Sequence, residues 1–105
     1  MTASERTKLL KQYLDDVINV LDSKGKAYSG TDNVNRNIED TANDLRLTKY
    51  QVWSVFFKKH IDCIFNSIAD NPEAPVDNTE SLDGRITDAI NYLLILKTML
   101  VDDKM

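Results

Sequence analysis

The stretch ESLDGRITDAINYLLILKTMLV, residues 80–101, decides the fold of this chain. Its apolar residues recur at steps of three and four, the spacing that lines one face of an α-helix. The face consists of Leu82, Ile86, Ala89, Ile90, Leu93, Leu96 and Leu100. Further apolar residues widen this face in the second half, so the helix must be central or be covered by a second chain.

Helices are predicted over residues 3–24, 34–45, 49–69 and 80–102. Thr2 with Glu5, and Thr48 with Gln51, have the spacing of a capping box, which marks a helix start. The first helix has an apolar face that is expected to be buried. This face is made of Leu10, Leu14, Val17, Ile18 and Leu21.

Two polar segments are expected to separate these helices. Residues 23–33 contain Gly25 and Gly30 among small polar residues, a composition typical of a loop. Residues 70–79 contain two prolines, and Asn78 or Thr79 is expected to cap the last helix.

The chain is therefore predicted to form a single all-α domain over residues 1–105, a bundle of three long helices and one short helix. The helix at 49–69 is as apolar as the last one, with Trp53, Phe56 and Phe57 on one face. Two neighbouring helices cannot cover so much apolar surface in a chain of 105 residues. We therefore expect a homo-oligomer that completes the bundle.

Composition narrows the class of protein. The net charge of −4 repels phosphate backbones and disfavours nucleic acid as a partner. The first residues lack the pattern of a signal peptide, and the single Cys63 cannot form an internal disulfide. The longest apolar run, residues 92–96, is too short to span a membrane. These features predict a cytoplasmic protein that is not inserted in a membrane.

Residues 38–55 have the spacing of a helix-turn-helix, which gives one alternative function, a DNA-binding regulator. Thr48 would cap the second helix, and Val52 and Val55 would face inward. Lys49 and Tyr50 would then face the major groove. Against this reading, the preceding helix carries acids that would lie close to DNA phosphates.

Acidic residues in the last helix are the main candidate site. Glu80, Asp83 and Asp88 have spacings at which carboxylates can share Mg²⁺ bound to a nucleotide's phosphates. The same acids are also explained by the helix dipole, with Arg85 paired to one of them. His60, on an apolar face, is more typical of a hydrogen-bonded core or interface residue than of a catalytic base.

Residues 87–94, TDAINYLL, resemble the second metal helix of the all-α nucleotide pyrophosphohydrolases of the MazG type. The chain is also similar to small phage-encoded proteins of that superfamily, including the nucleotide-modification-associated domains. Those proteins have a Lys and a Tyr before a short Gly loop, which here is KGKAYSG, residues 24–30. The resemblance extends over residues 24–96. It implies a ligand site formed by Lys24, Lys26, Tyr28, Arg85, Asp88 and Tyr92.

The chain departs from the family where a metal site needs acids. Arg85 stands where the pyrophosphohydrolases have a Glu, and Glu39, Asp40 and Asn43 only partly match the other acidic helix. A guanidinium opposes cation binding but can hold a phosphate directly. The resemblance therefore implies a phage-type protein, in the cytoplasm of an infected host cell, that binds a nucleotide or a nucleotide-derived signal. Mg²⁺-dependent hydrolysis is left open, and a small inhibitor that binds a host enzyme is the second alternative.

Overall fold

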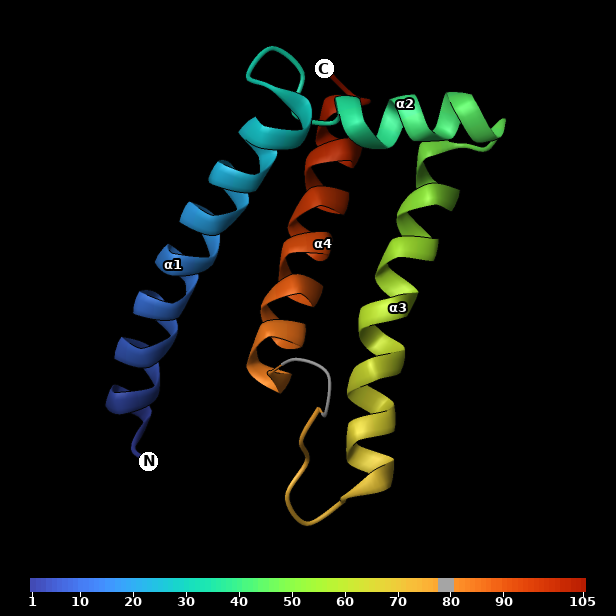
Figure 1. Cartoon of the computed structure of the whole chain (residues 1–105). Helices are drawn as coiled ribbons and strands as arrows, with labels where there is room; N and C mark the ends of the chain where they lie inside the picture. Colours follow the sequence, from blue (N-terminus) through green and yellow to red (C-terminus); the bar gives the residue numbers. More distant parts are fainter. Residues whose placement is uncertain (78–80) are drawn as a thin grey trace.

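The computed structural model describes residues 1–77 and 81–105, which contain four α-helices (Figure 1). They are α1 (Ala3–Ser29), α2 (Arg36–Leu45), α3 (Lys49–Asp70) and α4 (Leu82–Asp102). No strand occurs in the described residues, and the predicted all-α fold class is confirmed.

The three long helices stand side by side in the order α1, α4, α3, and α2 lies across one end of them (Figure 1). α4 packs against both α1 and α3, and α2 packs against α1 and α3. Within the described part of the chain, α1 and α3 do not pack against each other. α4 is therefore the central helix of the layer, one of the two positions that its apolar pattern predicts.

Both predicted capping boxes are present. The side chain of Thr2 accepts a hydrogen bond from the backbone N–H of Glu5 at 3.1 Å, and Thr48 accepts one from Gln51 at 3.1 Å. The start of α4 differs from the prediction, because its N-cap is Ser81, which accepts a hydrogen bond from Gly84 N at 3.0 Å. The predicted caps Asn78 and Thr79 lie outside the described residues.

The first helix is longer than predicted, since α1 runs through Gly25 and ends at Ser29. One glycine costs a helix only about 1 kcal/mol, and the residues around Gly25 are mostly good helix formers. The chain turns at Gly30, whose φ of 75° is a conformation that glycine adopts without strain. Lys24, Lys26 and Tyr28 are therefore held on a helix, although the sequence predicted a loop there.

The core lies where α2 crosses α3 and α4. Its buried residues are Ile38, Ala42, Val52 and Met99, and Trp53 and Phe56 are among the half-buried residues packed against it. Trp53 stacks on Phe57 with a centroid separation of 4.8 Å, and its Nε1 donates to the backbone oxygen of Tyr92 at 2.6 Å. The hydrogen bond from Trp53 joins α3 to the middle of α4.

The predicted apolar face of α1 is mostly uncovered. Val17 is buried, but Leu10, Leu14 and Ile18 remain exposed. The cause is that, among the helices that the structure describes, only α4 lies beside the first half of α1, because α3 lies beyond α4. The expected burial of this face was wrong for the single chain.

Replacement of Gly25 by alanine is expected to raise the free energy of unfolding by roughly 0.5–1 kcal/mol. A Cβ at this position meets no atom within 4 Å, so the methyl group reduces the freedom of the unfolded chain without a clash. Gly84→Ala is the matched control, because its Cβ would lie 3.0 Å from the capping Oγ of Ser81. Urea denaturation should show a gain for Gly25→Ala only, and a loss of stability there would contradict the helical assignment.

Candidate functional site

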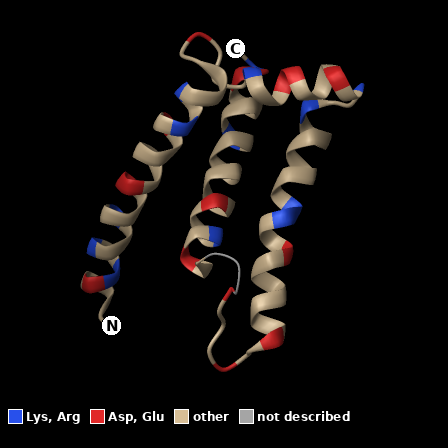
Figure 2. Cartoon of the chain, in the orientation of Figure 1, with Lys and Arg blue, Asp and Glu red and all other residues tan. Residues whose placement is uncertain are grey.

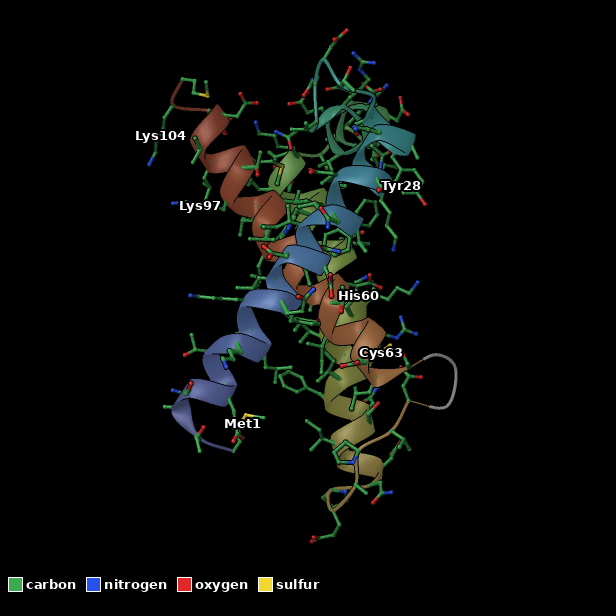
Figure 3. All side chains as sticks on the ribbon, turned by 90° about the vertical axis from the view of Figure 1, so that its left-hand side faces the viewer. Met1, Tyr28, His60, Cys63, Lys97 and Lys104 are labelled. Carbon is green, nitrogen blue, oxygen red and sulfur yellow. The ribbon has the colours of Figure 1, made fainter. Side chains whose placement is uncertain are left out.

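A cavity of about 680 Å³ opens between the second half of α1, the start of α2, and the middle of α3 and α4. Five of the six predicted ligand residues line it, although they come from segments about sixty residues apart. α1 supplies Lys24, Lys26 and Tyr28, and α4 supplies Asp88 and Tyr92. The bundle therefore brings together most of the site that the sequence predicted, and Figure 3 shows Tyr28 and His60 on the same edge of the molecule.

Aromatic rings form one wall of the cavity. The ring of His60 stacks on that of Tyr92 with centroids 5.3 Å apart, and Phe56 tilts against Tyr92 at 6.3 Å. The indole of Trp53 also contacts this residue, because its Nε1 donates to the backbone oxygen of Tyr92. Burial raises the pKa of Tyr92, and the nearby Asp88 carboxylate and Tyr28 raise it further. The Tyr92 hydroxyl therefore keeps its proton at neutral pH and can donate a hydrogen bond.

Asp88 is the charged centre of the cavity. One of its carboxylate oxygens lies 3.8 Å from Lys24 Nζ and the other lies 3.8 Å from His60 Nδ1. Asp22 also lines the cavity, so two acids face the two lysines of α1. Lys24 is largely offset by Asp88, which leaves the exposed Lys26 as the cation more available to a ligand.

Asn91 is the cavity residue whose role the sequence did not reveal. It is 6% exposed, and its buried Oδ1 accepts no hydrogen bond from any described residue. Two other buried polar side chains of the lining do have partners: Ser29 Oγ accepts from Asn37 N, and Asn35 Nδ2 donates to Asp102 Oδ2. A buried acceptor without a donor is costly, and proteins retain one mainly where a ligand or water satisfies it. The signal in the sequence was a polar residue inside the apolar run of α4.

The predicted metal residues are not assembled in the described part of the chain. Glu80 lies outside the described residues, Asp83 is exposed in the first turn of α4, and only Asp88 lines the cavity. Among residues 1–77 and 81–105, no group of three or more His, Cys, Asp or Glu side chains could hold a metal ion. The Mg²⁺ site stays a prediction.

Arg85 does not line the cavity. It is 7% exposed, and its Nε donates to Asp77 Oδ2 at 2.9 Å, so the guanidinium is buried against an acid from the connection before α4. The sequence predicted either a phosphate contact or a pair with an acid of the same helix. Asp77 directly precedes the undescribed residues 78–80, and no helical pattern in the sequence marks it as a partner of Arg85.

Removal of the Arg85 guanidinium should destabilise the fold rather than affect a ligand. Arg85→Met is expected to lower the free energy of unfolding by roughly 3–5 kcal/mol, because the buried Asp77 carboxylate loses its neighbouring charge. The double variant Arg85→Met/Asp77→Leu should recover most of that loss.

The surface pair of Lys58 with Asp62 provides the control for this prediction. Lys58→Met should cost at most about 0.5 kcal/mol, because both side chains are largely exposed. Urea denaturation measures all three variants. If Arg85→Met/Asp77→Leu were no more stable than Arg85→Met, the Arg85–Asp77 pair would not be the contact through which Arg85 stabilises the fold.

The turn between α2 and α3 resembles that of a helix-turn-helix, but the residues expected to contact DNA are already engaged within the chain. Arg46 takes the left-handed conformation that ends α2, and Val52 is buried as expected, but Val55 is 62% exposed. Lys49 and Tyr50 both donate to Asp103. Their hydrogen bonds with Asp103 raise the pKa of both groups and lower the pKa of the Asp103 carboxyl. Acidic residues are also spread along α2, as Figure 2 shows. Their negative charge opposes the approach of DNA phosphates.

Comparison with models of protein families, with curated proteins and with solved structures finds no match for this chain. The resemblance to the MazG-type family stays a prediction that rests on residues 24–96. No helix in the described segments combines the length and apolar character needed to cross a membrane.

Proposed function

We propose that this protein binds a nucleotide or a small nucleotide-derived anion in the cavity between its four helices. The observation that carries the proposal is the buried Asn91 Oδ1, which lies beside an aromatic wall and has no hydrogen-bond donor among the residues that the structure describes. An N–H group of a nucleobase, seated against Tyr92 and His60, supplies both the missing donor and a flat surface for the rings.

The size of the cavity suits such a ligand. Sites for small molecules typically span about 300–1,000 Å³ and combine apolar walls with a few convergent polar groups. This cavity, at about 680 Å³, has Phe56 and Ile95 among its apolar residues and Asn91 and Tyr92 as polar ones. Asn91 and Tyr92 both line the cavity from α4, so a base bound there can contact the amide and the ring.

The charges that line the cavity favour a ligand with few phosphate groups. Asp22 and Asp88 offset two lysines, so the lining carries no large positive excess for a triphosphate. Lys26 is exposed and can pair with one phosphate, as a flexible point charge does. A nucleoside monophosphate is therefore the best match without a metal ion, and binding without hydrolysis is the activity that these residues support.

Calorimetric titration of nucleoside mono-, di- and triphosphates with each base, in EDTA and in Mg²⁺, tests the proposal. Asn91→Leu should weaken the best ligand about tenfold, the value of one buried hydrogen bond. The same variant should melt no lower than the parent, because leucine of similar shape replaces an acceptor that the free protein leaves unsatisfied.

Charge reversal of a lysine separates phosphate contacts from nonspecific attraction. Lys26→Glu should weaken the monophosphate but hardly affect the nucleoside, whereas Lys8→Glu, on the same helix but outside the cavity lining, should leave both unchanged. Equal losses in the two variants would indicate nonspecific attraction. A folded protein that binds no nucleotide in EDTA or in Mg²⁺ would defeat the proposal and favour the protein-binding alternative.

A further inference from the structure

The chain exposes more surface than a compact monomer of its size. Its accessible surface is 7661 Å², whereas size scaling gives about 6,000 Å² for a monomer of 12.0 kDa. The Cα radius of gyration is 15.8 Å, compared with about 13 Å for a compact chain of this length. The excess is about 1,700 Å² per chain, the area that one subunit typically buries in an obligate homodimer.

A row of apolar residues on α4 accounts for part of this excess. Ile86, Leu93 and Leu100 are seven residues apart, so they share one flank of the helix, and they are 39%, 50% and 44% exposed. Each lies two residues from a cavity-lining residue: Asp88, Ile95 and Thr98, respectively. Two residues correspond to about 200° around a helix, so the row faces away from the cavity.

This row lies in the middle of the layer formed by α1, α4 and α3. Among residues 1–77 and 81–105, α4 has α1 on one side and α3 on the other, the cavity on one face and no helix over the opposite face. Lys97, on the exposed side of α4, and Tyr28, at the cavity, lie on opposite edges of the molecule in Figure 3. Domains normally bury apolar surface between two packed layers, and a single chain here supplies only one.

We propose that a second copy of this chain supplies the other layer, with the two α4 helices packed antiparallel about a twofold axis at Leu93. The row is self-complementary in that arrangement, because Ile86 and Leu100 lie seven residues on either side of Leu93. Leu93 then meets Leu93 of the second copy, and Ile86 meets Leu100. The excess surface of two copies, about 3,400 Å² over the whole of both chains, is large enough to include an interface of the size that obligate homodimers bury.

The second exposed apolar stripe, on α1, is a poorer match for a second copy. Leu10, Leu14 and Ile18 continue at steps of three and four into Leu21 and Gly25, which line the cavity. A copy seated on that stripe would lie along the cavity side of the molecule. The α4 row leaves the cavity open in both copies, so dimerisation and ligand binding are independent.

Light scattering coupled to size-exclusion chromatography tests the dimer at micromolar concentration. The wild type should elute as a particle of about 24 kDa, twice the 12.0 kDa of the chain. Leu93→Glu should give a folded monomer, because it places two like charges together on the axis. Val55→Glu, an equivalent change at a position 62% exposed on α3, should leave the dimer intact.

Disulfide cross-linking provides a readout that does not depend on how Leu93→Glu folds. In a Cys63→Ser background, Leu93→Cys should form a covalent dimer on mild oxidation, since a residue on a twofold axis meets itself. Leu14→Cys in the same background should not. A wild type that remains at 12 kDa, or cross-linking at position 14 but not at 93, would overturn the proposal.

Discussion

The rest of the structure depends on the packing of α3 against α4, with α2 lying across one end of both helices. Met99 and Val52 are fully buried between these helices, and Trp53 joins α3 to the backbone of α4 at Tyr92. The contacts of α1 with the rest of the chain include the buried Val17, the 2.5 Å hydrogen bond between the Tyr13 and Thr87 hydroxyls, and the hydrogen bond from Asn37 N to Ser29 Oγ. In the described part of the chain α1 does not pack against α3, and the cavity opens between these helices with α2 and α4 also lining it.

The sequence predicted the fold wherever the determinant was local. Thr2 and Thr48 mark helix starts because a capping box involves residues three apart, and α4 follows from its own periodicity. The prediction failed where tertiary context decides. The helix through Gly25 was missed because composition favours a loop there, and the burial of Leu14 depends on whether another helix lies beside it.

The candidate site was predicted in part, from a family resemblance rather than from a local physical pattern. Lys24, Lys26, Tyr28, Asp88 and Tyr92 were grouped by resemblance, and the bundle does bring them to one cavity. Arg85 was misplaced because nothing local identifies Asp77, in the preceding connection, as its partner. Asn91 was missed because an unsatisfied acceptor is defined by what surrounds it in space, and no pattern along the chain reports that.

We propose that α3 and α4 form the stable unit, while α1 is docked over a cavity that a ligand completes. Native-state hydrogen exchange, followed residue by residue, tests it most directly. The amides in the middle of α3 and α4 should exchange slowest and those in the first half of α1 much faster, and a bound nucleotide should slow residues 21–29 of α1. An α1 protected as strongly as α4 in the free protein, and unchanged by ligand, would contradict the account.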